Sequence, residues 1–277
     1  MPNIRLTHYT SPVALLVLLA VGMPPRAAVP QAEDIVLATT TSIRDAGLLD
    51  ALLPAFERKT GYAVKVIAVG SGQAMELGRR GEASILIVHD SAGEQRFMDQ
   101  GFGTTREPLM HDEFVLVGPR TDPAGVRGLR IHDAMRAIGN TGSLFVSRSD
   151  RSGTDVKEKQ LWHDSRVSPT RIWIRESGQG MSPTLQISSE LQAYTLTDVG
   201  TLLMHRSPLE LEILVRGDPV LENPYHVILI NQRRFPWINS AGAKSLMDYL
   251  LSPDVQQLIG EFGREVDGRS LFVPGAR

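Results

Sequence analysis

The chain has 277 residues, with 29 Lys or Arg and 31 Asp or Glu, so its formal net charge is −2 at pH 7. This near-neutral balance argues against a nucleic-acid-binding protein, because such proteins usually carry a basic excess. The sequence contains no cysteine, which excludes thiolate catalysis, disulfides, cysteine-based zinc sites and a lipid anchor on cysteine. The length suffices for two modest domains with their own cores.

The first thirty residues differ from the rest of the chain. Arg5 precedes the apolar run Val13–Val21, which is too short to span a bilayer but suits a secretory signal. We therefore expect residues 1–30 to be a signal peptide, cleaved between Ala27 and Ala32, and the folded part to be periplasmic. An uncleaved N-terminal anchor is the alternative.

From residue 34 onward, short apolar runs alternate with segments of helical periodicity. This order is typical of a parallel sheet with crossover helices. In the first part, strands are predicted at 35–38, 64–69 and 84–88, and helices at about 48–60, 73–80 and 92–100. In the second part, strands are predicted at 114–117, 144–146, 172–174, 211–215 and 226–230, and helices at 131–139, 156–163, 185–194, 241–251 and from Pro253.

The apolar strands 114–117 and 226–230 flank a self-contained middle segment. We interpret them as paired crossings between two lobes, which would make a hinge and allow the lobes to close over a small molecule. Residues 34–117 together with 226–277 would then form lobe I, and residues 118–225 lobe II. The three tryptophans are expected to pack in the cores or between the lobes, and an apolar stripe on the last helix is expected to be buried. These residues are Trp162, Trp173, Trp237, Val255, Leu258, Ile259 and Phe262.

Four polar loops lie between a predicted strand and a predicted helix, two in each lobe. They are Thr39–Ser42, Gly70–Gln73, Arg148–Thr154 and Ser177–Gly180. Open α/β sheets bind ligands at the carboxyl ends of their strands. A helix N-terminus adds unpaired N–H groups and the positive end of the helix dipole. Closure of the two lobes would bring the four loops face to face.

A small anion with acceptor oxygens on every side would fit such a place. Three helix N-termini and Arg148 together supply about 2.5 positive charges, which suits a dianion better than a neutral sugar or an amino acid. Arginine also offers a flat fork of donors to oxygen atoms. The hydroxyl groups that would add donors belong to Thr41, Ser42, Ser71, Ser152 and Thr154.

At these residues the chain resembles the tungstate-binding proteins of tungstate ABC importers. The similarity runs in order, with consistent spacing, from about residue 34 to the C-terminus. The matching stretches include Leu37–Ser42, Phe56–Tyr62, Ile67–Ala74, Arg80–Ala83, Phe114–Pro119, Val146–Arg148, Ser152–Thr154, Glu176–Met181 and Ala193–Asp198.

The resemblance implies a two-lobed, type II periplasmic binding protein, each lobe a mostly parallel sheet flanked by helices, with two hinge crossings. Such a protein captures tungstate, or molybdate, and hands it to the membrane permease of an ABC transporter. It is expected to be a monomer that is not an enzyme and uses no metal or cofactor. The oxyanion-binding residues implied are Thr41, Ser42, Ser71, Gly72, Arg148, Ser152, Gly153 and Thr154.

The chain departs from the family pattern near the arginine. Ser149 and Arg151 stand where the family usually has a glycine and a second aspartate, and Asp155 stands where it usually has a histidine. Asp155 would place negative charge in the first turn of a helix beside the anion, and Arg151 is the candidate to offset it. These departures leave the ligand's identity open.

Other functions remain open from the residues alone. The Arg…Ser-Gly-Thr loop also resembles that of phosphate-binding proteins, and Asp150 or Asp155 could accept the proton that phosphate retains, so phosphate or sulfate is an alternative ligand. A sensor that reports anion levels without transport is another possibility. A metal-dependent phosphohydrolase would need clustered His–Asp pairs. The chain has such pairs at His89-Asp90, His111-Asp112, His132-Asp133 and His163-Asp164.

Overall fold

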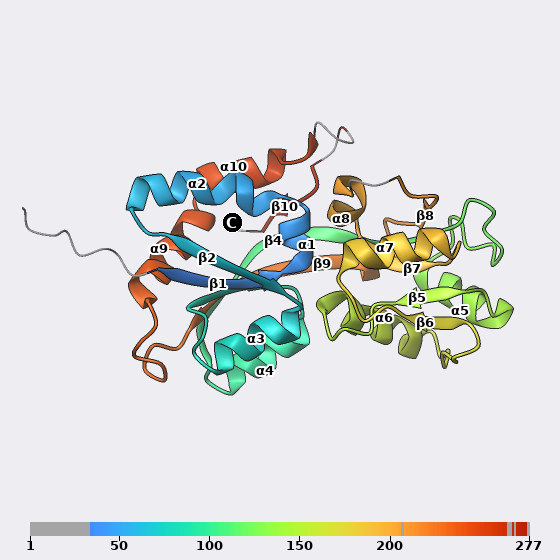
Figure 1. Ribbon diagram of the computed structural model, residues 1–277, viewed down its shortest axis with the longest axis horizontal. Helices are drawn as coiled ribbons and strands as arrows, with labels where there is room; N and C mark the ends of the chain where they lie inside the picture. The colour runs from blue at the N-terminus through green and yellow to red at the C-terminus, as the bar shows by residue number, and fades with distance from the viewer. Residues whose placement is uncertain (1–33, 206–207, 265–267, 269, 276–277) are drawn as a thin grey trace, which may run out of the picture. The chain divides into compact units, whose positions relative to one another are not determined.

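In the computed structural model, one long strand, β4 (Gly103–Gly118), contributes to two sheet regions and two sets of hydrophobic cores (Figure 1). The structure describes residues 34–205, 208–264, 268 and 270–275. The predicted signal peptide and its cleavage site lie outside these residues. The described residues belong to one compact unit.

The first sheet region combines parallel and antiparallel pairs. Its strands are β1 (Ile35–Thr40), β2 (Val64–Val69), β3 (Ile85–Val88), β9 (Glu222–Ile230), β10 (Val273–Pro274) and residues 103–113 of β4. β1 lies between β2 and β3 and is parallel to both, as the crossover pattern predicts. The crossing strand β9 is antiparallel to β3 and to β4, and β10 is antiparallel to β4.

Helices cover both faces of this sheet because its buried strands are apolar on both sides. On β1, Ile35 and Leu37 pack in the core that α2, α9 and α10 close, whereas Ala38 packs with α3 and α4 on the other face. Figure 1 shows the same division of the helices about β1. The helices are α1 (Thr41–Asp45), α2 (Leu48–Thr60), α3 (Ser71–Arg79), α4 (Ser91–Asp99), α9 (Ser240–Leu250) and α10 (Pro253–Glu261).

The second lobe repeats this three-layer arrangement around the end of β4. Phe114 and Leu116 pack on one face with α5 and α6, and Val115 and Val117 pack on the other with α7 and α8. The elements are α5 (Ile131–Thr141), β5 (Phe145–Ser147), α6 (Gly153–Asp164), β6 (Ile174–Glu176), α7 (Met181–Glu190), β7 (Thr195–Asp198), α8 (Val199–Met204), β8 (Glu212–Val215) and a 3-10 turn (Pro219–Leu221).

Strand pairing in this lobe is also mixed. β5 and β6 are parallel, and β7 and β8 are both antiparallel to β4. The exact division of the chain into lobes at residues 117 and 225 stays a prediction, although Phe114 and Leu116 already pack with the second lobe. Within the described residues, no helix combines the length and the apolar character that crossing a membrane requires.

The structure corrects several predicted elements. Residues 191–194 are not helical: α7 ends at Glu190, Gln192 takes a left-handed φ of 51°, and the chain then enters β7, a strand that the sequence did not predict. Trp237 is 67% exposed and Leu258 is 50% exposed, so neither belongs to a core. Trp237 instead donates its indole N–H to the carbonyl of Gly81 at 3.0 Å, which satisfies that group at the surface.

Candidate functional site

The first predicted turn follows β1 directly. Thr41 begins α1, so a buried strand passes into a helix without a connecting loop. Ser42 is 4% exposed, and its hydroxyl lies 3.1 Å from Oγ1 of Thr40 and 3.5 Å from the hydroxyl of Tyr225 on β9. Thr41 is half-buried. The turn is therefore anchored to a crossing strand through Ser42.

The second turn follows β2. Gly70 has extended backbone angles and precedes α3, which begins at Ser71. Ser71 is fully buried, and its hydroxyl accepts a hydrogen bond from the backbone N–H of His89 at 3.4 Å. Gly72 is half-buried in the first turn of the helix. The hydrogen bond ties the carboxyl ends of β2 and β3 together at one edge of the sheet.

The third turn is a loop organised around Arg148 and Asp150. Arg148 is 2% exposed, and its guanidinium donates to Oδ2 of Asp150 from both Nε, at 3.2 Å, and Nη2. The other oxygen of Asp150 accepts from the backbone N–H of Ser152 at 3.1 Å. Ser149 and Arg151 have φ values of 47° and 60°. This left-handed region favours glycine, so Ser149 and Arg151 hold backbone angles that side chains rarely adopt.

The same loop ends in the cap of α6. Ser152 is the N-cap residue, and its hydroxyl accepts from the backbone N–H of Asp155 at 3.2 Å. Gly153 and Thr154 form the buried first turn. The carboxylate of Asp155 is offset by Lys159, whose ammonium group lies 2.7 Å away. Arg151, the residue that the sequence suggested for this role, contributes its backbone N–H at 3.0 Å.

The structure brings turns of the two lobes into contact. A Cβ added to Gly70 would lie 3.2 Å from the Cα of Ser152, and one added to Gly72 would lie 3.0 Å from the carbonyl oxygen of Arg151. At the fourth loop, a Cβ on Gly180 would lie 3.7 Å from Oγ1 of Thr41. The eight predicted residues therefore belong to turns that meet, and six of them are buried.

Sequence reasoning missed His89, which lies between the lobes. Its ring Nδ1 is 2.9 Å from Oδ1 of Asn223. The Asn223 amide group donates to Oδ1 of Asp112 at 2.6 Å and to the Tyr225 hydroxyl at 3.2 Å. Because the amide nitrogen serves these two acceptors, its oxygen faces the imidazole, and Nδ1 carries the proton. Burial lowers the pKa of His89 to about 4, so the ring is neutral near pH 7.

A signal for His89 was present in the sequence. It follows directly after β3, at the same sheet edge as the Thr41 and Ser71 turns. Because His89 precedes an aspartate, the sequence analysis considered it only as part of a possible metal site. Within the described residues, no group of three or more His, Asp or Glu side chains is placed to hold a metal ion.

Known proteins are similar to most of this chain. A model of the PBP superfamily domain matches residues 25–254. The tungstate-binding protein TupA of Peptoclostridium acidaminophilum is 43% identical over 246 residues, which cover 88% of this chain and 86% of that protein. The crystal structure of the tungstate ABC transporter from Geobacter sulfurreducens is 40% identical, with a TM-score of 0.76 over 83% of this chain and 99% of that one.

A second solved structure, the tungstate-binding protein TupA from Desulfovibrio alaskensis G20, is 38% identical. It has a TM-score of 0.74 and covers 89% of this chain and 100% of its own. These matches extend over nearly the whole folded part and include both lobes. The chain therefore belongs to the PBP superfamily and, within it, to the family of the TupA tungstate-binding proteins.

Proposed function

We propose that this protein is an extracytoplasmic solute-binding protein that captures a tetrahedral oxyanion, tungstate or its close analogue molybdate, and delivers it to the permease of an ABC transporter. The observation that carries the proposal is the meeting of helix-start turns from both lobes around Arg148. Thr41, Ser42 and Ser71 would contact the anion from one lobe, and Arg148 and the Ser152–Thr154 turn from the other. The TupA relatives support tungstate as the ligand.

The chemistry of the turns favours an anion that only accepts hydrogen bonds. Helix N-termini and hydroxyl groups supply donors, and tungstate, molybdate and sulfate carry no proton near neutral pH. Asp150 is already occupied by Arg148 and the backbone of Ser152. A fully deprotonated dianion would therefore meet donors without facing a free carboxylate from Asp150.

Phosphate is a second candidate because of one specific atom. Oδ1 of Asp155 is buried and has no hydrogen-bond partner within the described part of the chain. A carboxylate oxygen of this kind could accept the proton that phosphate retains at neutral pH. The side chain lies in the first turn of α6, close to the proposed site.

The remaining features of the proposal follow from this role. Residues 1–30 would direct the chain out of the cytoplasm as a signal peptide, and the mature protein would act as a monomer in the periplasm. It would carry out no catalysis, and the transported anion would be its ligand in place of a cofactor. Residues 34–117 with 226–277, and residues 118–225, are the proposed lobes that close over the anion.

A thermal-shift panel with tungstate, molybdate, sulfate and phosphate tests the function. A ligand that binds only the folded protein stabilises it by about 4.1 kcal/mol at a concentration 1,000 times its Kd. We expect the largest rise in melting temperature with tungstate or molybdate. An equal or larger rise with phosphate, lost in Asp155→Asn, would support the second candidate, and no rise with any oxyanion would contradict the proposed function.

A further inference from the structure

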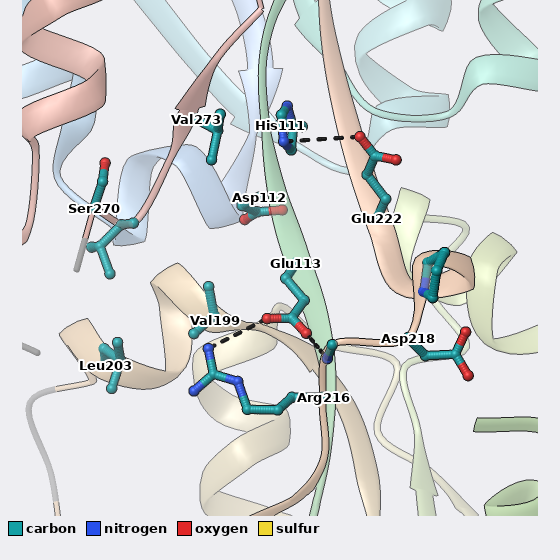
Figure 2. A pocket seen from close by; sticks show the side chains of 13 residues that line it. His111, Asp112, Glu113, Val199, Leu203, Arg216, Asp218, Glu222, Ser270 and Val273 are labelled. Carbon is teal, nitrogen blue, oxygen red and sulfur yellow. Dashed lines mark hydrogen bonds and ion pairs between the residues drawn. The ribbon is translucent and has the colours of Figure 1, made fainter. Parts of the chain in front are cut away.

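A cavity of about 360 Å³ lies beside the crossing strands (Figure 2). None of the eight predicted anion-binding residues lines it. Its walls come from both lobes: β4 and β9 at their crossing, the segment that ends in β10, α8, and the connection that follows β8. The volume lies within the range of about 300–1,000 Å³ that is usual for small-molecule sites.

The cavity wall carries an excess of carboxylates. It is lined by four acidic residues and one arginine: Asp112, Glu113, Asp218, Glu222 and Arg216. The Glu113 carboxylate accepts a hydrogen bond from the guanidinium of Arg216 at 3.4 Å and another from the backbone N–H of Gly217. Asp218 accepts two backbone N–H groups. The negative charge exceeds the positive charge on the wall, so a cationic ligand is favoured over an anion.

One carboxyl oxygen of Asp112, in this wall, lacks a partner among the described residues. The residue is 5% exposed, and its Oδ1 accepts from Asn223 at 2.6 Å. Its Oδ2 is buried without a hydrogen-bond partner among the described residues. Figure 2 shows the Asp112 carboxyl at the cavity wall, in the same view as Val199 and Val273. A buried polar atom without a partner is costly, and a ligand with a hydrogen-bond donor would remove that cost.

We propose that this cavity is a second ligand site, which binds a small organic cation through an ion pair between its ammonium group and Asp112. Val199, Leu203, Leu271 and Val273 would contact the apolar body of the ligand. A metal ion fits less well, because no group of three or more metal-ligating side chains is placed for coordination in the described part of the chain. The wall combines the Asp112 carboxyl group, which can form an ion pair, with an apolar surface. An alkylammonium compound matches both features.

Binding would also change the ionisation of Asp112. Burial, reinforced by Asp198, raises the pKa of Asp112 well above its usual range. An ammonium ion beside Oδ2 favours the carboxylate and would therefore lower this pKa relative to the free protein.

The site is connected to the candidate anion site. Asp112 accepts from Asn223, Asn223 accepts from His89, and the His89 ring touches Gly153 in the opposite lobe. The cavity has this shape while the turns of the two lobes are in contact, so a cation that fills it would favour the closed arrangement. By linkage, the cation would tighten oxyanion binding. Only this coupling rests on the proposed function, whereas the cation site does not.

Cyclohexylammonium is a suitable probe, and cyclohexanol and cyclohexanecarboxylate serve as neutral and anionic controls of similar size. In the mature protein with labelled methyl groups, we expect cyclohexylammonium to shift the signals of Val199, Leu203, Leu271 and Val273 saturably. It should bind at least tenfold more tightly than either control. Equal binding of cyclohexanol, or tighter binding of the carboxylate, would overturn the proposal.

Asp112→Asn keeps the side-chain shape and should weaken cyclohexylammonium binding at least tenfold. Asp133→Asn, at an exposed aspartate on α5, is the matched control and should leave the binding unchanged. If Asp112→Asn does not fold, Leu203→Trp tests the same cavity by filling it and should abolish binding. Unchanged binding in the folded variants would refute the site. An unchanged tungstate affinity at saturating cyclohexylammonium would refute the coupling alone, and failure of tungstate to bind would refute the proposed function.

Discussion

Gly153 lies so close to His89 that a Cβ added to it would be 2.6 Å from Cε1 of the imidazole and 2.9 Å from the histidine's carbonyl oxygen. The two residues belong to different lobes: His89 follows β3, and Gly153 begins α6. The ring cannot turn away freely because Nδ1 is bonded to Asn223. Contact between the lobes at this point therefore depends on the absence of a side chain at position 153.

Gly153→Ala is expected to weaken tungstate binding tenfold or more, which corresponds to about 1.4 kcal/mol. The added methyl group would clash with backbone and ring atoms of His89 and keep the lobes apart. The free protein can relieve the clash by opening, so its own stability should change little. Titration calorimetry with tungstate measures the first effect, and chemical denaturation without ligand measures the second.

Gly180→Ala is the matched control for that variant. Gly180 also precedes a helix at the contact between the lobes, but a Cβ there would lie 3.7 Å from Thr41, an ordinary van der Waals distance. We expect its tungstate affinity to change by no more than about twofold. Similar losses in the two variants would show that the close approach of Gly153 to His89 has no special importance.

Arg148→Ala is expected to weaken oxyanion binding tenfold or more, about 1.4 kcal/mol, with the fold retained. The side chain is nearly fully buried among the turns, and its guanidinium, which Asp150 holds in place, would donate to the anion. Arg148→Lys should recover only part of the loss, because an ammonium group lacks the planar fork of donors. Titration calorimetry on both variants measures the oxyanion affinity, which should be highest in the unmodified protein, lower in Arg148→Lys and lowest in Arg148→Ala.

Arg151→Ala is the control for Arg148, since Arg151 is an exposed arginine in the same loop. Its replacement removes the same formal charge from the loop without removing a buried donor. We expect a much smaller loss of affinity than with Arg148→Ala. Equal losses would mean that the loop acts through its total charge, and the role assigned to Arg148 would be wrong.

The sequence predicted much of the fold because the signals were local. A run of apolar residues followed by Ser, Thr or Gly is a local pattern, and the starts of α1 and α3 lie where such runs end. β7 was missed because only pairing makes it a strand: Thr195–Asp198 lies antiparallel to Phe114–Val117, about eighty residues earlier in the chain. Without that partner, the sequence predicts a helix over 185–194 and no strand directly after it.

The residues of the candidate site likewise fall into two groups, those that local sequence could predict and those that it could not. The turns at Thr41, Ser71 and Ser152 could be placed between a strand and a helix from neighbouring residues alone, although the short helix α1 was not predicted. His89 and Asn223 could not, because they are 134 positions apart and meet only when the crossing strand β9 pairs with β3. The role of such residues depends on long-range pairing, which no local pattern contains.

Glu158 should make the stability of the protein depend on pH. It is buried in α6, where it accepts from the backbone of Arg148 at 3.2 Å and from the indole of Trp162 at 3.3 Å. Burial raises its pKa from 4.5 to about 7. The folded state then holds the proton more tightly than the unfolded state, so its contribution to stability is lost as pH rises from about 4.5 to about 7. The loss is about 3 kcal/mol.

Denaturation of the unmodified protein and of Glu158→Gln between pH 4.5 and 8 measures this effect. The glutamine cannot titrate, so the difference in unfolding free energy between the two proteins should shift in favour of the variant as pH rises. Glu190→Gln, an exposed position on α7, controls for the substitution itself. A pH-independent difference between the protein and Glu158→Gln would contradict the assignment.

Arg106 should matter for stability because it neutralises a buried carboxylate. Glu94 on α4 is fully buried, and its Oε2 lies 2.7 Å from Nη2 of Arg106 and 2.9 Å from Nδ1 of His226. Arg106→Met would leave Glu94 without its guanidinium partner, at a cost of about 3–5 kcal/mol. Adding Glu94→Gln removes the buried charge and should recover much of that loss. Chemical denaturation measures both variants. The control is Lys244→Met, which breaks an exposed ion pair with Asp248 and should cost at most about 1 kcal/mol of stability. An equally small cost for Arg106→Met would show that Glu94 does not depend on Arg106.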